Sequence, residues 1–295
     1  MFEIFFYYIG MIFSIYYLCK LIRWIHKYFL LSLPDFKNKY GDGFVIITGG
    51  SSGIGFSFAK EFVKLNFKIL LISSSKQKLL KAKQELEKIN SKPKIEILPF
   101  NLNQTFDSKT IEDFDKNLTE ILGGEEISVL INNAGVITRK YLCDITDEQI
   151  LSMLNVNTIA VTFITKIVLQ KMLKRKNRSL IVGSGSVMGI FRFPTRSVYG
   201  STKSYLEAFY ESLQREYGDR VDFTDLEIGP VETELNKLNM PLKIDSDSFC
   251  SNTMKYLGKY NFTTSCLKHE INVLIIKKLP FVKDFVCKYL KNKFT

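Results

Sequence analysis

Short apolar runs alternate with longer segments of helical character between residue 44 and about residue 235. The apolar runs have the length of buried strands and lie at 44–47, 68–73, 95–100, 127–131 and 180–182. The segments between them predict helices at about 53–66, 76–90, 108–122, 148–174 and 198–217. This regular alternation predicts an α/β fold, a doubly wound parallel sheet flanked by helices, with ligand sites at the carboxyl ends of the strands.

The N-terminal segment has a different pattern, because no charged residue interrupts it from Ile4 to Cys19. Lys20, Arg23 and Lys27 then follow on one helical face. An apolar run with this cationic flank predicts a transmembrane helix whose C-terminal end faces the cytosol or the mitochondrial matrix. A cleaved signal peptide is excluded, because its positive charge would precede the apolar run. The alternative is a buried core helix.

The C-terminal segment carries two apolar stretches, 271–276 and 281–290, which Pro280 and several lysines interrupt. They are too broken to span a bilayer, so we expect helices that lie on the membrane around a lipidic entrance. The alternative is that they only pack on the core. The last five residues, Lys291-Asn292-Lys293-Phe294-Thr295, resemble the K-x-K-x-x retrieval signal of endoplasmic reticulum membrane proteins.

The composition narrows the possible chemistry. Only two of the 295 residues are histidines, His26 and His269, and both lie outside the middle of the chain. This excludes Ser-His-Asp hydrolysis and histidine-rich zinc chemistry in the core, and we expect no metal site. The five cysteines are scattered without a CxxC spacing, which indicates reduced thiols. The net charge of +11 forms no basic block or nucleic-acid motif, so it favours a membrane surface over nucleic acid.

A glycine-rich turn follows the first apolar run and reads Thr48-Gly49-Gly50-Ser51-Ser52-Gly53-Ile54-Gly55. A strand, such a turn and a helix form a phosphate cradle, because the backbone can approach a pyrophosphate closely and the helix N-terminus offers free N–H groups. The glycine spacing is G-x-x-x-G-x-G rather than G-x-G-x-x-G. We therefore expect a dinucleotide at this turn.

The second apolar run ends in Ser73-Ser74-Ser75-Lys76, without a carboxylate. Cofactors with a free ribose 2′-hydroxyl usually meet an acidic residue at this position. Hydroxyl groups and one cation could instead hold a 2′-phosphate, so this segment favours NADP(H) over NAD(H). The alternative is that Lys76 only begins a solvated helix.

Tyr199 and Lys203 are four residues apart, so they lie one turn apart on the same face of the predicted helix. A fixed ammonium group stabilises the phenolate and lowers the pKa of a tyrosine from about 10 toward neutrality. The pair can therefore act as an acid–base group. Ser186 follows the fifth strand, 13 residues before Tyr199, so a loop can bring it back beside the phenol. The alternatives are an ordinary surface tyrosine and lysine, and a turn serine.

Taken together and in order, these motifs resemble the signature of the short-chain dehydrogenase/reductase family over residues 44–235. The matching elements are Thr48-Gly49-x-x-x-Gly53-Ile54-Gly55, Asn132-Asn133-Ala134-Gly135, Asn157, Ser186, Tyr199-x-x-x-Lys203 and Ile228-Gly229-Pro230-Val231-Glu232-Thr233. The resemblance implies a Rossmann fold and the reduction of a carbonyl by hydride transfer from a nicotinamide cofactor.

The resemblance also implies a role for each motif residue. Tyr199 would donate the proton, and Lys203 would lower its pKa and bind the nicotinamide ribose. Ser186 would hydrogen-bond the carbonyl oxygen, and Asn157 would hold a water of the proton relay. The implied cofactor contacts are Thr48, Gly49, Ser51, Ser52, Gly53, Ile54, Gly55, Ser74, Lys76, Asn101, Leu102, Asn132, Ala134, Gly135, Tyr199, Lys203, Pro230, Val231 and Thr233.

Within the family, the chain resembles the membrane-anchored branch of very-long-chain 3-oxoacyl-CoA reductases and 17-beta-hydroxysteroid dehydrogenases. The resembling features are the N-terminal apolar segment, Leu33-Pro34-x-Phe36 with Tyr40-Gly41, and the segment from Leu71 to Leu79. That branch commonly has arginine where Ser74 stands, and the family often has aspartate where Asn101 stands. The missing arginine at Ser74 weakens the expectation of NADPH, Asn101 is a departure near the adenine, and neither difference touches the catalytic residues.

This branch implies a membrane-anchored, NADPH-preferring reductase of a lipid carbonyl, such as a 3-oxoacyl-CoA or a steroid ketone. A retinoid or keto-sphingoid substrate is an alternative, as is an accessory subunit of a membrane complex that keeps a structural nucleotide. A homodimer remains possible. We expect the endoplasmic reticulum membrane with a cytosolic catalytic domain, or alternatively the mitochondrial inner membrane. The expected domains are a membrane anchor (1–32), a linker (33–43), a dinucleotide-binding catalytic domain (44–235), and a substrate loop with membrane-associated helices (236–295).

Overall fold

The computed structural model describes residues 2–233 and 243–294. The chain forms two compact units, Met1–Leu33 and Pro34–Thr295. The domain boundary expected at residue 235, the beginning of the expected substrate loop at 236–242, and the terminal Thr295 of the expected retrieval signal lie outside the described residues.

The first unit consists of helix α1 (Phe2–Ile25) and the π-helical turn η1 (His26–Leu30). Residues Ile4–Leu30 are long and apolar enough to cross a membrane, and none of their most apolar 18-residue window is buried, although Tyr28 near the end of the span is buried. Among the described residues, Asp147–Met172 passes the same test but is 44% buried, as expected of a core helix. The prediction of an N-terminal apolar helix is confirmed as a candidate membrane span.

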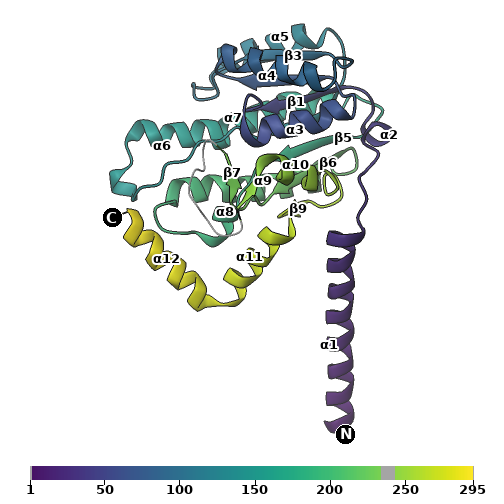
Figure 1. The fold of residues 1–295 in the computed structure, drawn as a ribbon, viewed down its shortest axis with the longest axis vertical. Helices are drawn as coiled ribbons and strands as arrows, with labels where there is room; N and C mark the ends of the chain where they lie inside the picture. Colours follow the sequence, from purple (N-terminus) through teal and green to yellow (C-terminus); the bar gives the residue numbers. More distant parts are fainter. Residues whose placement is uncertain (1, 234–242, 295) are drawn as a thin grey trace. The chain divides into compact units, whose positions relative to one another are not determined.

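The second unit contains a seven-stranded parallel sheet (Figure 1) with the order β3-β2-β1-β4-β5-β6-β9. In the middle of the sheet, Ile46 of β1 lies beside Leu70 of β2 on one side and beside Leu130 of β4 on the other. The strands are β1 (Phe44–Thr48), β2 (Ile69–Ser73), β3 (Ile95–Pro99), β4 (Ile127–Asn132), β5 (Ser179–Gly183), β6 (Val221–Leu226) and β9 (Phe262–Thr263). The predicted doubly wound Rossmann sheet is confirmed, and its order reverses between β1 and β4.

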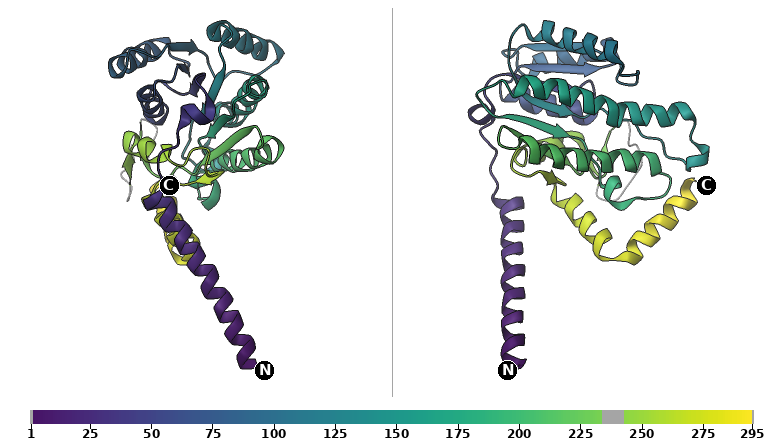
Figure 2. Two further views of the ribbon diagram at one scale, coloured as in Figure 1. Left: turned by 90° about the vertical axis from the view of Figure 1, so that its right-hand side faces the viewer. Right: turned by 180° about the vertical axis from the view of Figure 1, so that it is seen from behind.

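Helices cover both faces of the sheet (Figure 2). Alternate strand residues point to opposite faces, so Val45 and Ile47 pack with Phe58 in one core, whereas Ile46 packs with Phe114 in the other. The first core lies beneath α3 (Gly53–Lys64), α4 (Lys76–Ile89) and α10 (Ser246–Met254). The second lies beneath α5 (Ser108–Leu122), α7 (Ala160–Met172) and α9 (Ser197–Tyr217).

The long helix expected at 148–174 is interrupted. It begins as α6 (Asp147–Leu154), widens into the π-helical turn η3 (Asn155–Ile159) and continues as α7. A capping box between Thr146 and Gln149 starts α6. The interruption was not visible in the apolar spacing, and π-helical turns within α-helices frequently occur at functional sites.

The C-terminal part forms two helices, α11 (Leu267–Lys278) and α12 (Pro280–Phe294). Pro280 begins α12, where its missing N–H costs no intrahelical hydrogen bond. Val273 of α11 and Leu290 of α12 pack in a small apolar cluster with Phe191 and Phe193. These helices therefore pack on the rest of the Pro34–Thr295 unit, while a part of their apolar surface stays exposed. The shorter elements are η2 (Leu142–Asp144), α8 (Val187–Phe191), β7 (Val231–Glu232) and β8 (Ile244–Asp245).

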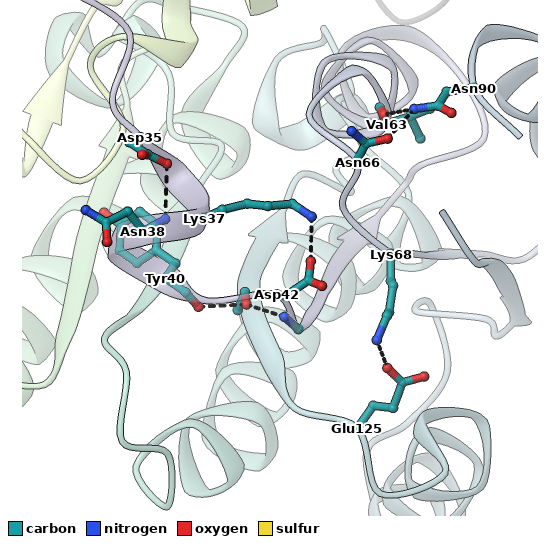
Figure 3. A network of polar contacts seen from close by, with 12 residues as sticks. Asp35, Lys37, Asn38, Tyr40, Asp42, Val63, Asn66, Lys68, Asn90 and Glu125 are labelled. Atoms are coloured by element: carbon teal, nitrogen blue, oxygen red, sulfur yellow. Dashed lines mark hydrogen bonds and ion pairs between the residues drawn. The ribbon is translucent and has the colours of Figure 1, made fainter. Parts of the chain in front are cut away.

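The segment expected as a linker, 33–43, contains a short helix, α2 (Phe36–Tyr40). Figure 3 shows the Asp35 side chain accepting a hydrogen bond from the Asn38 backbone, which begins the helix. Phe36 and Tyr40 are buried, and the Tyr40 hydroxyl donates to Asp222 over 2.8 Å. Helix α2 is therefore packed on the rest of the Pro34–Thr295 unit through aromatic side chains. The positions of proline and glycine in this segment did not indicate that packing.

Asp222 accepts hydrogen bonds from three groups: the Tyr40 hydroxyl, Arg178 at 2.6 Å and Lys39 at 2.7 Å. Burial alone would raise the pKa of this carboxyl, but these hydrogen bonds hold the pKa below its usual value. A carboxylate with a lowered folded-state pKa adds stability above its unfolded pKa of about 4, and this contribution is lost as the pH falls through the folded-state pKa.

We expect Asp222→Asn to lower the free energy of unfolding by about 1.5–3 kcal/mol at pH 7, because charge-assisted hydrogen bonds are lost. The difference from the wild type should shrink as the pH falls from about 4 through the lowered folded-state pKa, because the unfolded wild-type carboxyl is protonated first and the folded one only at lower pH. Urea unfolding at pH 7 and pH 3.5 measures both effects. The exposed Asp219→Asn is the matched control, and a difference that is independent of pH would contradict the prediction.

Candidate functional site

A cavity of about 1050 Å³ opens at the carboxyl ends of β1, β4 and β5 in the Pro34–Thr295 unit. In a doubly wound sheet this is the edge where ligands bind, at the reversal of strand order. The following residues expected from sequence line it: Gly49, Ser51, Ser52, Gly53, Ile54, Ser74, Asn101, Leu102, Ala134, Gly135, Ser186, Tyr199, Lys203, Pro230, Val231 and Thr233. The fold therefore brings most of the expected site residues to one cavity.

The glycine-rich turn forms one end of the cavity. Gly53 has a φ of +54°, which L side chains rarely adopt, and a Cβ there would lie 3.4 Å from the Thr233 side chain, so Thr233 lies beside the turn. A Cβ at Gly55 would lie 2.5 Å from the Asn133 amide nitrogen, so the turn packs too closely for any side chain there. Ser52 precedes α3 without a side-chain cap bond, so the amides of the first helical turn are available to an anion. This arrangement fits the pyrophosphate of a dinucleotide.

Two residues expected at this end, Thr48 and Asn132, make hydrogen bonds within the protein instead of lining the cavity. The Thr48 hydroxyl accepts hydrogen bonds from the backbone N–H groups of Asn133 and Ala134, at 3.0 and 3.1 Å. Buried Asn132 donates to Thr165 and to the Tyr210 hydroxyl. Both residues fix the turn after β4, which in turn forms the cavity wall.

The end of β2 forms the adjacent wall. Ser74 lines the cavity, whereas Lys76 is exposed at the first position of α4 and is not part of the lining. On the same side the cavity is lined by Phe100 and Asn103, which sequence reasoning missed. Because they follow β3 directly, the rule that ligands meet strand ends could have indicated them.

Tyr199, Lys203 and Ser186 lie together at the other end of the cavity. The Lys203 ammonium is buried, lies 5.6 Å from the centre of the Tyr199 ring, and donates to the Ser184 carbonyl over 2.6 Å. The Ser186 hydroxyl begins α8 and donates to the Ile228 carbonyl over 3.2 Å. A Cβ at Gly189 would lie 2.9 Å from the backbone of α9, so α8 packs directly against the helix that carries the tyrosine.

Asn157 lies behind this group, in the π-helical turn η3, and is fully buried. Its Nδ2 donates to the Val136 carbonyl and to the Thr202 hydroxyl, and its Oδ1 accepts from the Val136 N–H over 2.9 Å. The amide thereby connects the turn after β4 to α9. It is outside the cavity lining, and its carbonyl oxygen retains one acceptor lone pair.

Sequence reasoning missed a buried carboxyl group behind Lys203. Asp225 on β6 is enclosed by the protein and accepts from the Gly185 N–H over 3.0 Å. Burial raises its pKa to about 7, against the opposing effects of the Lys203 charge and the Gly185 hydrogen bond. An aspartate inside a strand that is otherwise buried was the available signal.

His269 was set aside in the sequence because it lies outside the middle of the chain, yet α11 brings it against Gly229 and Pro230, which line the cavity. The fully buried ring accepts a hydrogen bond from the Gly229 N–H at Nδ1, and its Nε2 lies 3.3 Å from the Pro230 carbonyl. Burial lowers its pKa, although hydrogen bonding to Pro230 opposes the shift. His269 therefore holds the segment that follows β6 and links it to the C-terminal helices.

The remaining wall is largely apolar. It includes Met188 and Phe193, together with Phe285, Val286, Tyr289 and Leu290 of α12. Two arginines, Arg139 and Arg196, also line the cavity, and no sequence motif indicated them. This end can therefore hold an apolar molecule with its carbonyl beside Tyr199.

Comparison with known proteins gives consistent matches. The sequence pattern of the short chain dehydrogenase family matches residues 43–241 of this chain. A Caenorhabditis elegans protein named among the steroid dehydrogenases is 31% identical over 257 residues, which cover 84% of this chain and 95% of that protein. The human very-long-chain 3-oxoacyl-CoA reductase is 31% identical over 243 residues, 80% of this chain and 75% of the reductase. The fold also resembles a short-chain dehydrogenase from Sphingobium yanoikuyae in complex with NADPH, with a TM-score of 0.65, 24% identity, and coverage of 72% of this chain and 84% of that structure.

Proposed function

This chain belongs to the short chain dehydrogenase family and is an oxidoreductase, and from that premise we propose that it is a membrane-anchored, NADPH-dependent reductase of lipid ketones. The observation that carries the proposal is the shared cavity. The glycine-rich turn, the Tyr199–Lys203 pair and Ser186 lie along one space, whose far wall is apolar. A purely structural subunit would have no use for this combination, which makes the accessory-subunit alternative the weaker one.

The residues at the turn end fit a dinucleotide. The α3 amides and Gly53 would hold the pyrophosphate, Ser74 and Asn101 the adenosine half, and Val231 the nicotinamide side. When bound, NADPH supplies the hydride that the carbonyl carbon receives. The preference for NADPH over NADH rests on the absence of a carboxylate at the end of β2.

The protein's own groups act on the carbonyl oxygen. Tyr199 donates its phenolic proton to that oxygen, so the ketone becomes a secondary alcohol. The Lys203 ammonium stabilises the phenolate that remains, and the Ser186 hydroxyl donates a hydrogen bond where negative charge develops. Asn157 holds Thr202, the neighbour of Lys203 in α9, and its side-chain oxygen can accept a hydrogen bond from a water that returns the proton.

The lipid substrate and the membrane fit the rest of the chain. The candidate span Ile4–Leu30 would anchor the protein, and Lys20, Arg23 and Lys27, which follow its uncharged part, support a cytosolic position for the Pro34–Thr295 unit. Exposed Phe281 and Phe285 of α12 could insert into the bilayer surface beside the cavity. The endoplasmic reticulum membrane is part of this proposal, with the mitochondrial inner membrane as the alternative.

The test is NADPH oxidation by the full-length protein in nonionic detergent with long-chain ketones, 3-oxoacyl thioesters and steroid ketones. Turnover of at least one of these with formation of the alcohol is the expected result. Binding of neither NADPH nor NADH, measured by nicotinamide fluorescence, would overturn the proposal. Equal affinity for the two cofactors would overturn only the NADPH preference.

We expect Ser74→Arg to tighten NADPH binding about tenfold and to leave NADH binding unchanged, because a guanidinium pairs with the 2′-phosphate in a bidentate manner. Nicotinamide fluorescence titrations with both cofactors measure this ratio. Gln84→Arg, which adds the same positive charge at an exposed position of α4, is the control for a general effect of charge. A ratio that Ser74→Arg does not change would mean that the 2′-position of the ribose does not lie at the end of β2.

A further inference from the structure

A buried carboxyl group lies close to the Tyr199–Lys203 pair without reaching the cavity. Asp225 is the fifth residue of β6, is 2% exposed and is not part of the cavity lining. Its Oδ1 accepts a hydrogen bond from the Gly185 N–H over 3.0 Å. Burying a carboxylate is costly unless it is paired and hydrogen-bonded, so its position at this site needs a physical reason.

One peptide unit connects this carboxyl to the Lys203 ammonium. The Ser184 carbonyl accepts from the Lys203 Nζ over 2.6 Å, and the N–H of the same peptide unit, which belongs to Gly185, donates to Asp225. The peptide is trans, so its carbonyl and its N–H point in opposite directions. The ammonium and the carboxyl therefore lie at opposite ends of one peptide dipole, and each hydrogen bond strengthens the other.

The connection is tightly packed and shielded from water. A Cβ at Gly185 would lie 2.6 Å from both carboxylate oxygens, so a larger residue there would push the carboxyl away from the peptide. Ser184 and Lys203 are buried as well. Charges interact more strongly in such surroundings than at the surface, because little water screens them.

The Lys203 ammonium is the neighbouring charge with the largest effect on Asp225. Burial raises the pKa of the carboxyl to about 7, and the Lys203 charge opposes this shift. Three acidic groups also interact electrostatically with the carboxyl: Glu207 and Tyr210 of α9, and Glu227 beyond the end of β6. The residues paired with Asp225 in the neighbouring strands, Gly183 of β5 and Phe262 of β9, are uncharged. Lys203 is therefore the charge that an ionised Asp225 balances.

This balance affects the reacting phenol. The Lys203 ammonium lies 5.6 Å from the centre of the Tyr199 ring, and a cation at that place favours the phenolate. A carboxylate near the same cation offsets part of its charge and thereby favours the protonated phenol. Ketone reduction requires the protonated form, because the phenol donates the proton.

We propose that Asp225 is a positioning residue that holds the Ser184–Gly185 peptide against Lys203 and, when ionised, offsets part of the Lys203 charge, so that Tyr199 stays protonated for reduction. This inference rests on the proposed function, because it takes Tyr199 as the proton donor. It assigns the direction of the reaction in part to a residue that contacts neither substrate nor cofactor.

Asp225→Asn tests the charge separately from the hydrogen bond, because the amide oxygen can still accept from Gly185. Ultraviolet absorbance is recorded above pH 7, where the wild-type carboxyl is mostly ionised, for each full-length protein and for the same protein carrying Tyr199→Phe. The difference gives the ionisation of Tyr199. We expect its midpoint to fall by about one pH unit in Asp225→Asn, the lower end of the range for a single neighbouring charge. An unchanged or higher midpoint would overturn the inference.

Glu207→Gln is the matched control, because it removes the same charge one helical turn beyond Lys203, at an exposed position of α9. Water and salt screen a charge at that place, so the midpoint should move by less than about 0.3 pH unit. Asp225→Ser, whose hydroxyl can also accept from Gly185, repeats the test with a second neutral residue. Thermal unfolding shows that each variant compared is folded. An equal shift in Glu207→Gln and in the Asp225 variants would contradict the proposal.

Turnover separates this inference from the proposed function. In ketone reduction at saturating NADPH, the alkaline limb of the pH profile of kcat/KM should move to lower pH by about one unit in Asp225→Asn. A merely structural role would lower the rate at every pH without moving this limb, which would refute the inference but leave the reductase. A shifted Tyr199 ionisation without reduction of any ketone would refute the reductase but leave the coupling between Asp225 and Tyr199 standing.

Discussion

Tyr199→Phe is expected to lower kcat by about 10²–10⁴-fold and to leave NADPH binding nearly unchanged. The substitution removes only the hydroxyl that donates the proton, and general acid catalysis contributes about this factor. The aromatic ring stays, so its contact with the Lys203 ammonium and the packing of α8 against α9 stay as well. The pyrophosphate cradle at the opposite end of the cavity is not altered.

Steady-state kinetics and nicotinamide fluorescence titration on the same preparation measure the two quantities. Tyr205→Phe is the matched control, because it removes a hydroxyl from the same helix that contacts Thr162 on the protein surface. It should change kcat less than twofold. Parallel loss of turnover and of cofactor affinity in Tyr199→Phe would contradict the assigned role, as would retained turnover.

The second large effect is on stability. Gly183 ends β5, and a Cβ there would lie 2.0 Å from a ring carbon of buried Tyr210. Tyr210 cannot move away easily, because its hydroxyl accepts a hydrogen bond from Asn132 and its ring packs in the core. We expect Gly183→Ala to lower the free energy of unfolding by more than about 3 kcal/mol. This is a larger loss than most substitutions that overpack a core cause.

Thermal unfolding of the full-length protein in detergent measures the loss, with an expected decrease in Tm of about 6–12 °C. Gly200→Ala is the matched control, because its Cβ would meet the Met188 carbonyl at 3.2 Å and alanine is favoured within a helix. Gly183→Ala combined with Tyr210→Leu should lose less stability than the sum of the single variants, since the leucine relieves the clash. Strict additivity would mean that the clash is not the cause.

The strands and most of the helices could be predicted from local pattern. The helix 108–122 was predicted with the bounds that the structure has, and β1 to β5 differ from prediction by one or two residues at their ends. The differences are larger where local and tertiary preferences disagree. Asn157 uses its side-chain amide on Val136 and Thr202 within a π-helical turn, and apolar spacing does not encode that choice.

The residues of the candidate site also fall into two groups, those that a local motif indicates and those that only tertiary packing places. Residues that act through a local motif, such as Gly53 and the Tyr199–Lys203 pair, could be named from the sequence, because the required spacing lies within one turn or one helix. Lys76 shows the limit of this reasoning. It follows the strand end as a phosphate ligand would, but the start of α4 directs it to the surface, and its role as a cofactor ligand stays a prediction.

The sequence by itself determined the strand and helix alternation, the apolar N-terminal helix and the order of the motifs, because each depends on neighbouring residues and backbone periodicity. The tertiary structure alone decided which distant residues meet. Arg139, from the segment after β4, and Arg196, from the start of α9, line one cavity with Tyr199. Asp225 interacts with Lys203, and His269 reaches Gly229 from a C-terminal helix. Such long-range contacts depend on how helices and strands pack across the fold, and the spacing of residues along the chain does not encode this packing.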